Sequence, residues 1–410
     1  MKNILILLDY YLPFASANGV CCEKVASEFR DNGYDVNIVA YAYDDKEYEN
    51  INGIHVHYAR KIKKKSYGIW SKLAFYAAWL FKFSKYPVTE IKEQTDEIAR
   101  VASQVIENKN IDTVVCVHLP VETLVAGVKL KEKYPHLTYV SYMLDSLSGG
   151  IAPKFLPYNF CRFRKIKWEN NLLALFDGNI LMESSRQHHT TYTADLEWYK
   201  KAHFLDVPAL CKNSHVEDGN IKVNDEVILG FVGTMSDGVR TPYALLKVLS
   251  GISDLNIRFV IAGKNACGDL YEYLKDQNNI MLNVLGEVPY DRAQDILREC
   301  DFFVNLGNVN PNLVPSKIFE YMSYGKPIIS TFNSAEDSSL PYLHKYPVVC
   351  LIDEHDDNIK NAAGILTEFI KEHRETRVSY ESIAELFYNN TPVAFRDLLL
   401  KICGEENEKT

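Results

Sequence analysis

The residues with the clearest chemical potential follow a buried strand that we expect at Phe302–Leu306. Pro315 and Ser316 open a helix whose first turn carries Lys317, with Glu320 about one turn in. The first N–H groups of a helix have no partner within it, so a helix start is a natural phosphate site. The carboxylate of Glu320 can accept hydrogen bonds from the vicinal hydroxyls of a ribose. The spacing indicates a nucleotide site; the alternative is that Ser316 caps the helix and Glu320 is a solvated acid.

The strands and helices that would position this site alternate along the chain, which is the pattern of parallel α/β sheets. The first series of strands is expected at Ile4–Leu8, Val36–Ala40, Ile54–Tyr58, Thr113–Val117, Thr138–Met143 and Gly178–Met182. The second series is expected at Val227–Val232, Arg258–Ala262, Ile280–Leu285, Phe302–Leu306, Pro327–Ser330 and Val348–Leu351. Because ligands of such sheets bind at the carboxyl ends of the strands, we expect the chemistry in the strand-to-helix loops.

Two series of strands in 410 residues predict two domains. We place an N-terminal Rossmann-like domain at 1–205, completed by a C-terminal helix at 380–403, and a second Rossmann-like domain at 225–379. Residues 206–224 are expected to form a linker, because Lys212–Asn220 is a polar stretch.

The composition excludes several functions. A net charge of −9 argues against a general nucleic-acid binder. Nine cysteines without a C-x-x-C pair form no zinc or disulfide framework, which favours the cytoplasm. No stretch approaches the roughly 18–20 apolar residues of a membrane span. Neither a G-x-G-x-x-G nor a P-loop motif occurs, so the nicotinamide and P-loop interpretations lose their main support.

The run Pro315–Tyr321 and its continuation to Ile328 resemble the donor-binding signature of GT-B glycosyltransferases. The similarity is greatest to the retaining glycosyltransferase family 4, or group 1, which builds bacterial surface polysaccharides. It implies an α/β GT-B fold, in which two Rossmann-like domains with parallel sheets face each other across a cleft. It also implies that Glu320 binds the ribose of a nucleoside diphosphate sugar. Many relatives carry a second Glu where this chain has Asn312, an amide without charge, which leaves the donor sugar open.

A turn in the second domain adds to this resemblance. Gly233 and Thr234 follow a strand and are similar to the family's turn beneath the donor pyrophosphate. Relatives often place an Arg after this Gly and a Lys further on. Here Thr234 takes the first place, and Arg240 is the expected cation at the second. A guanidinium can bind phosphate through two hydrogen bonds. The alternative for Arg240 is a surface charge before a helix.

The first domain, which the resemblance assigns to the acceptor side, offers four candidates. Asn18 and Gly19 lie in the first strand-to-helix loop, where relatives have a Gly-rich loop near the donor phosphates or sugar. His118 and Asp145 each follow a strand. The resemblance implies that His118 approaches the donor sugar, and Asp145 could orient an acceptor hydroxyl, so both are catalytic candidates. The structural alternatives are that Gly19 begins a helix, His118 is a core histidine and Asp145 caps a loop.

A basic run, Arg60–Lys65, precedes an aromatic-rich helix expected within Tyr67–Phe83. One helical stripe is predicted to pack on the sheet; it comprises Ile69, Leu73, Tyr76, Leu80 and Phe83. Other aromatics, Trp70, Phe75 and Trp79, lie off that stripe. Together with the basic run they suggest that Arg60–Phe83 binds an anionic membrane surface without spanning it. The alternative is a helix of the first domain with no lipid contact.

These features predict transfer of a sugar, of hexosyl type, from a nucleoside diphosphate sugar to a hydroxyl of a lipid-linked or cell-surface glycan. The resemblance implies retention of configuration, with the leaving phosphate taking the acceptor proton. No D-x-D motif occurs, and GT-B enzymes generally need no metal, so we expect neither a metal nor another cofactor. The expected location is the cytoplasm, at the inner face of the membrane. Two alternatives stay open, namely a sugar-nucleotide epimerase on the same fold and a non-catalytic GT-B binding protein.

Overall fold

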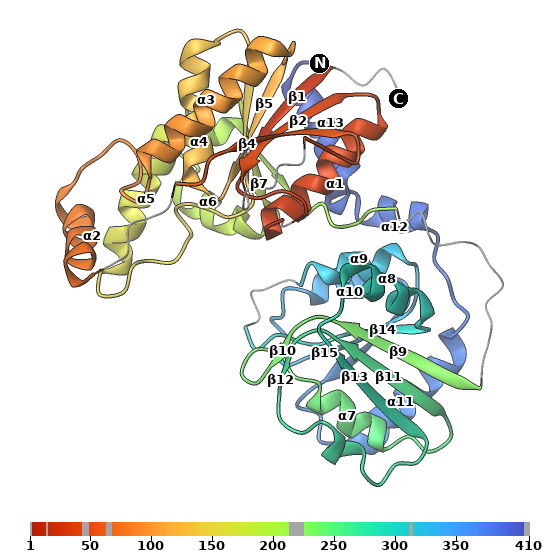
Figure 1. The fold of residues 1–410 in the computed structure, drawn as a ribbon. Coiled ribbons are helices and arrows are strands. Elements are labelled where there is room, and N and C mark those ends of the chain that lie inside the picture. The colour runs from red at the N-terminus through yellow and green to blue at the C-terminus, as the bar shows by residue number, and fades with distance from the viewer. Residues whose placement is uncertain are drawn as a thin grey trace. The chain divides into compact units, whose positions relative to one another are not determined.

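The computed structural model describes residues 2–13, 15–42, 49–62, 68–212, 225–310 and 315–405. The chain forms two compact units (Figure 1). The first comprises Met1–Pro208 and Asn389–Thr410, and the second comprises Ala209–Tyr388. Most of the polar stretch at 212–220 and most of the expected linker, residues 213–224, lie outside the described residues.

The first unit is built on an eight-stranded sheet of order β3-β4-β2-β1-β5-β6-β7-β8. Its strands are β1 (Asn3–Leu7), β2 (Asp35–Tyr41), β3 (Asn50–Ile51), β4 (Ile54–Ala59), β5 (Thr113–His118), β6 (Thr138–Met143), β7 (Gly178–Met182) and β8 (Ala202–Leu205). All neighbours are parallel except the β3–β4 pair. The strand order reverses between β1 and β5, which is where ligands of such sheets bind.

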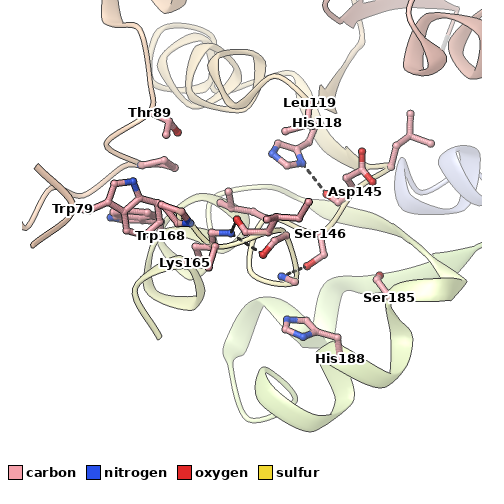
Figure 2. Close-up of a pocket in the computed structure, with 18 of the residues that line it drawn as sticks. Trp79, Thr89, His118, Leu119, Asp145, Ser146, Lys165, Trp168, Ser185 and His188 are labelled. Atoms are coloured by element: carbon pink, nitrogen blue, oxygen red, sulfur yellow. Dashed lines mark hydrogen bonds between the residues drawn. The ribbon is translucent and has the colours of Figure 1, made fainter. Parts of the chain in front are cut away.

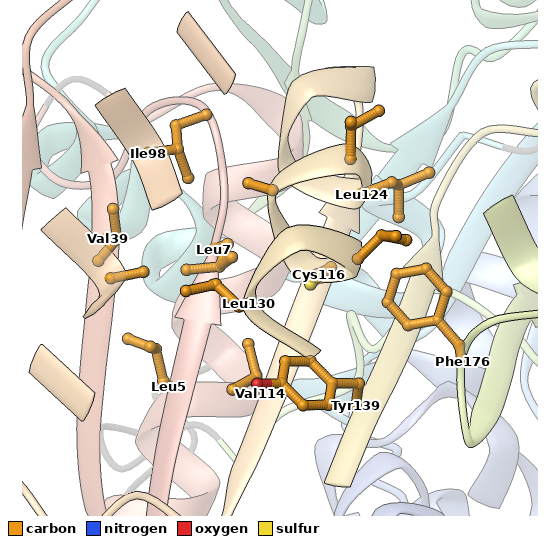
Figure 3. Close-up of a cluster of buried hydrophobic side chains, with 14 of the residues drawn as sticks. Leu5, Leu7, Val39, Ile98, Val114, Cys116, Leu124, Leu130, Tyr139 and Phe176 are labelled. Carbon is orange, nitrogen blue, oxygen red and sulfur yellow. The ribbon is translucent and has the colours of Figure 1, made fainter. Parts of the chain in front are cut away.

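Helices cover both faces of this sheet. They are α1 (Ala17–Asp31), α3 (Lys92–Asn108), α4 (Val121–Lys133), α5 (Tyr158–Leu173), α6 (Arg186–Tyr192) and α13 (Pro392–Ile402), with α2 (Ile69–Phe81) set apart beside α5 (Figure 1). Successive side chains of β1 alternate between the faces, as a strand requires. Leu5 and Leu7 pack with α3 and α4 (Figure 3), whereas Ile4 and Ile6 pack on the side of α1 and α13.

The second unit contains a six-stranded parallel sheet of order β13-β11-β9-β14-β15-β16. Its strands are β9 (Glu226–Val232), β11 (Asn256–Ala262), β13 (Ile280–Gly286), β14 (Phe302–Asn305), β15 (Ile328–Phe332) and β16 (Val349–Asp353), and a small pair is formed by β10 (Met235–Ser236) and β12 (Asn265–Ala266). Its helices are α7 (Tyr243–Ser250), α8 (Tyr290–Glu299), α9 (Lys317–Ser323), α10 (Leu340–Lys345), α11 (Ile359–His373) and α12 (Tyr380–Leu386). This is the strand order of a Rossmann fold, with its reversal between β9 and β14.

The C-terminal helix expected at 380–403 is two helices, α12 and α13, which belong to different units. The break lies at Thr391-Pro392. Thr391 accepts a hydrogen bond from the backbone N–H of Ala394 at 3.1 Å and thereby caps α13. Pro392 has no N–H for a preceding helical turn but suits a first helical position, so it begins a new helix.

The prediction for the stripe of α2 is wrong. Ile69, Leu73 and Phe83 are 78%, 56% and 79% exposed, whereas Trp79, which lies off the stripe, is 3% exposed. Helix α2 packs on α5 and not on the sheet, with the rings of Trp79 and Trp168 4.9 Å apart. A buried indole removes more apolar surface from water than any aliphatic side chain, so Trp79 selects the packed face.

Candidate active site

The first unit contains a cavity of about 820 Å³ at the carboxyl ends of β5, β6 and β7 (Figure 2). His118 ends β5, Asp145 follows β6, and Ser185 follows β7. The apolar wall comes from α2 and α5 and includes Phe75, Tyr76, Trp79 and Trp168. A largely apolar cavity with a few convergent polar groups is the usual form of a small-molecule site.

His118 and Asp145 are brought together at this cavity (Figure 2). The Nδ1 of His118 donates to the backbone carbonyl of Asp145 at 2.7 Å, so the contact does not use the Asp145 carboxylate. That bond fixes the tautomer and leaves the lone pair on Nε2. The Nε2 atom is buried and has no hydrogen-bond partner among the described residues. Burial lowers the pKa of His118 to about 4, so its ring is a neutral acceptor at neutral pH.

Two buried charged residues of α5 hold the loop that forms one wall of the cavity. Lys165 donates from Nζ to the carbonyls of Gly150 and Ile151, both at 2.8 Å. One turn further, Glu169 is fully buried and accepts from the hydroxyl and the backbone N–H of Ser148, at 2.5 and 3.2 Å. Burial raises the pKa of Glu169 to about 7 and lowers the pKa of Lys165. Sequence reasoning missed both residues, because such a pair on a helix is usually solvated.

Asn18 and Gly19 lie at the point where the strand order of the first unit reverses. The Asn18 amide donates to the backbone carbonyl of Leu119, directly after β5, at 3.0 Å. Gly19 is buried, and a Cβ there would lie 2.1 Å from the Tyr10 carbonyl oxygen. The glycine is therefore explained by the close packing of α1 on the preceding loop.

Gly233 and Arg240 lie at the corresponding point of the second unit. Gly233 follows β9 and packs closely on Gly263, which has φ of +128°. A Cβ on Gly263 would lie only 2.1 Å from the carbonyl oxygen of Gly233, so the contact requires glycine at position 263. The guanidinium of Arg240 donates from Nε and Nη2 to the amide oxygen of Asn308, at 2.9 and 2.7 Å. Asn308 lies just after β14, so the loops after β9 and β14 meet here. Thr234 is exposed.

Burial lowers the pKa of the Arg240 guanidinium. Because its bonds to Asn308 go to a neutral amide, they do not neutralise its charge. The half-buried guanidinium therefore keeps its charge at the point where the strand order of the second unit reverses.

Helix α9 carries the remaining candidates. Ser316 stands at the N-cap position but makes no capping hydrogen bond and is exposed, so the alternative that its side chain caps the helix is wrong. Its backbone is already helical, with φ of −58° and ψ of −23°, whereas a capping side chain needs an extended residue. Lys317 bonds to Glu320 at 3.0 Å, and Gln294 donates to the other carboxylate oxygen of Glu320 at 2.9 Å. Asn312 lies outside the described residues.

The continuation of the motif has structural roles. The Tyr321 hydroxyl accepts from the backbone N–H of Val232 at 3.0 Å and ties α9 to the end of β9. Gly325 has φ of +66° and approaches Val378 so closely that a Cβ would lie 2.0 Å from its carbonyl oxygen. Lys326 is buried and donates to three carbonyls at the end of α8, those of Leu297, Arg298 and Cys300, at 2.6–3.0 Å.

Two kinds of feature are absent from the described ranges. No helix within them is long and apolar enough to cross a membrane. They also contain no group of three or more His, Cys, Asp or Glu side chains that could hold a metal ion.

Comparisons with known proteins show the family of the chain. Residues 226–346, which hold Arg240 and Glu320, match the family described as Glycosyl transferases group 1. A protein of Methanocaldococcus jannaschii described as an uncharacterized glycosyltransferase is 30% identical over 341 residues, which cover 80% of each chain.

Solved structures share the fold at low identity. TarM has a TM-score of 0.61 at 12% identity, covering 99% of both chains. A glycosyltransferase from Rickettsia africae has a TM-score of 0.56 at 14% identity, also covering 99% of both chains. The lipopolysaccharide outer core galactosyltransferase WaaB has a TM-score of 0.52 at 14% identity, covering 98% of this chain and 99% of its own. The predicted GT-B fold is confirmed, and the chain belongs to the glycosyltransferase family, with a group 1 domain in its second unit.

Proposed function

We propose that this glycosyltransferase moves a hexosyl group from a nucleoside diphosphate sugar to a hydroxyl of a lipid-linked or cell-surface glycan, with retention of configuration. The observation that carries the donor assignment is the position of Arg240 and Asn308. They join the loops after β9 and β14, where the strand order reverses, inside the region that matches group 1 glycosyltransferases.

On this proposal the second unit binds the donor. The ribose hydroxyls would replace Lys317 and Gln294 at the two carboxylate oxygens of Glu320, which keeps the carboxylate satisfied in both states. Lys317 would then be free to turn toward the pyrophosphate, with Arg240 and the hydroxyl of Ser316. Gly233 and Thr234 would lie beneath the phosphates, and Asn312 would contact the sugar. Lys317 and Arg240 would stabilise the leaving diphosphate without a metal.

The cavity of the first unit would hold the acceptor and the transferred sugar. His118 presents a buried lone pair at Nε2, and sugar hydroxyls are donors that can satisfy it. Asp145 would orient the acceptor hydroxyl, and Asn18 and Gly19 would contact the transferred sugar. The aromatic wall from α2 suits the apolar face of a sugar ring.

A membrane surface on the first unit would supply the acceptor at the cytoplasmic face. The helix that lines the cavity with Phe75 and Trp79 exposes Ile69, Trp70, Leu73 and Phe81 on its other sides. The exposed lysines Lys72, Lys82 and Lys85 lie among them. Exposed aromatics with interspersed lysines fit an anionic bilayer. Lys61 packs on the Tyr41 ring, and residues 63–67 lie outside the described residues.

The test is a thermal-stability screen with UDP-glucose, UDP-N-acetylglucosamine, GDP-mannose and ADP-glucose, with and without EDTA. A donor at about a hundredfold excess over its Kd should stabilise the fold by ~2.7 kcal/mol. Transfer of the selected sugar to octyl β-D-glucoside, and the anomeric configuration of the product by NMR, then test the reaction. A converted sugar nucleotide without acceptor would indicate an epimerase, and no stabilisation with no product would defeat the proposal.

A further inference from the structure

A chain of hydrogen bonds runs from the buried Glu169 to the surface of the cavity. Glu169 accepts from the Ser148 hydroxyl at 2.5 Å, and the Ser148 oxygen lies 2.9 Å from Nε2 of His188. His188 lies on α6 and lines the cavity opposite Lys165 and Trp168 (Figure 2). Ser148 is 1% exposed and Glu169 is fully buried, so the chain is shielded from water except at His188.

The direction of these bonds follows from the number of protons available. Ser148 has one hydroxyl proton, and an ionised Glu169 can only accept. The Ser148 hydroxyl therefore donates to Glu169, and its oxygen is left to accept from Nε2–H of His188. This bond places the proton of His188 on Nε2 and the lone pair on Nδ1. A carboxylate orients the histidine of a catalytic triad in the same way.

We propose that His188 is an acceptor-binding residue, whose Nδ1 takes a hydrogen bond from a hydroxyl of the glycan in the cavity. Ser148 and Glu169 are positioning residues that hold its imidazole in the required tautomer. This inference rests on the proposed function. With Nε2 of His118, it gives the cavity two neutral acceptor nitrogens, which matches a ligand rich in hydroxyl donors.

Protonation of Glu169 reverses the direction of the hydrogen bonds between Glu169, Ser148 and His188. A protonated Glu169 keeps one oxygen on the Ser148 N–H and donates its own proton to the Ser148 oxygen. Ser148 then donates to Nε2 of His188 at 2.9 Å, which is nearer than the Ser146 hydroxyl at 3.4 Å. Lys165 lies beside Glu169, and Nδ1 of His189 lies 3.9 Å from the carboxylate. Arg162 and the ring of Tyr192, 5.2 Å away, lie near His188. Burial raises the pKa of Glu169 to about 7, so the reversal falls near neutrality.

The variant Glu169→Gln should hold these hydrogen bonds in the reversed direction. The Ser148 N–H, 3.2 Å from one carboxylate oxygen, requires the amide oxygen of Gln at that position. The amide NH₂ then faces the Ser148 oxygen and donates to it, so Ser148 donates to His188 at every pH. Glu132→Gln, on the exposed side of α4, is the matched control.

The first measurement needs no ligand. Long-range ¹H–¹⁵N NMR of the full chain with ¹⁵N-labelled histidine, with His188 assigned by comparison with His188→Gln, reports the tautomer directly. We expect Nε2–H in the wild type at about pH 8.5, where Glu169 is ionised, a change toward Nδ1–H at about pH 6, and Nδ1–H at both pH values in Glu169→Gln. An Nδ1–H tautomer in the wild type at the higher pH, or no effect of Glu169→Gln, would overturn the proposal.

The second measurement uses octyl β-D-glucoside as acceptor with the donor selected above. His188→Ala should raise the KM for the acceptor roughly tenfold, the equivalent of one hydrogen bond, with donor affinity unchanged. Glu169→Gln should also raise this KM. It should remove the fall in acceptor affinity that we expect of the wild type below about pH 7. His136→Gln, at an exposed site, is the control. An unchanged acceptor KM in His188→Ala would refute the acceptor-binding role of His188. Absence of transfer by the wild type would instead count against the proposed function, and the NMR measurement would then decide the tautomer.

Discussion

The two units share the order of a six-stranded Rossmann sheet, which the first unit extends with β3 and β8, but they build their candidate sites in opposite ways. The second unit collects its residues from a short stretch of chain around α9 and from two loops, and its charged groups are partly exposed. The first unit gathers distant residues of α2, β5, α5 and α6 around an 820 Å³ cavity and buries Lys165 and Glu169 to hold it. On the proposed function, the same topology would support a partly exposed site that recognises charge and a cavity that recognises shape. Four substitutions test this contrast, from the largest expected effect to the smallest.

Replacing Trp79 by Ala should cost about 4 kcal/mol in the free energy of unfolding, because it removes a buried indole and leaves a void beside Trp168. Chemical denaturation measures the loss. The control is Trp70→Ala on the same helix, where the side chain is 84% exposed and the expected change is small. Equal effects of the two substitutions would contradict the packing of α2 on α5.

Glu320→Ala should weaken donor binding about 100-fold, or roughly 3 kcal/mol, because two hydroxyl contacts to a carboxylate are lost. The fold should survive, since the side chain is only partly buried. Isothermal titration calorimetry with the selected donor measures the effect, and Glu368→Ala, at an exposed position of α11, is the control. Unchanged nucleotide binding would show that the ribose is bound elsewhere.

Lys326→Met should lower the free energy of unfolding by ~2 kcal/mol, because three carbonyls at the end of α8 lose a charged donor. Lys360→Met, at an exposed position, should be close to neutral. A loss of donor affinity without loss of stability would instead place Lys326 at the ligand and revise the contrast between the two units.

Lys72→Gln should weaken binding to anionic liposomes by ~1 kcal/mol, about fivefold, by removing one charge near the bilayer surface. Sedimentation with phosphatidylglycerol vesicles measures it, and neutral phosphatidylcholine vesicles and the exposed Lys360→Gln provide controls. Wild-type binding that is absent, or that does not fall with added salt, would refute the membrane surface.

The sequence predicted the second unit better than the first. The motif from Pro315 to Ile328 is continuous, so its helix, its Glu320 and its following strand could be read together. Even there, sequence reasoning missed the pairing of Glu320 with Lys317 and Gln294, and the structural reason for Lys326. The bond from Gln294 to Glu320 and the bonds from Lys326 to the end of α8 are not visible in sequence, because these residues meet only through the fold. Lys317 and Glu320, by contrast, lie three residues apart on α9.

The first unit shows where sequence reasoning failed. The periodicity of α2 predicted a buried stripe, yet Trp79 faces α5 and Ile69 and Leu73 face outward. Periodicity identifies a helix and its faces, but the partner decides which face is buried. Glu169 and His188 carried no signal, since a lone histidine and a helical glutamate are usually unremarkable in sequence.

The sequence by itself determined the α/β class, the two series of parallel strands, the GT-B fold and membership of the glycosyltransferases, because hydrophobic periodicity and a contiguous motif are local properties of the chain. Only the tertiary structure decided that α13 completes the first unit without α12, that α2 lines a cavity, and that buried Lys165 and Glu169 hold its wall. Burial and hydrogen bonding between residues far apart in the chain depend on which helices and strands pack together. A local sequence pattern does not specify that packing.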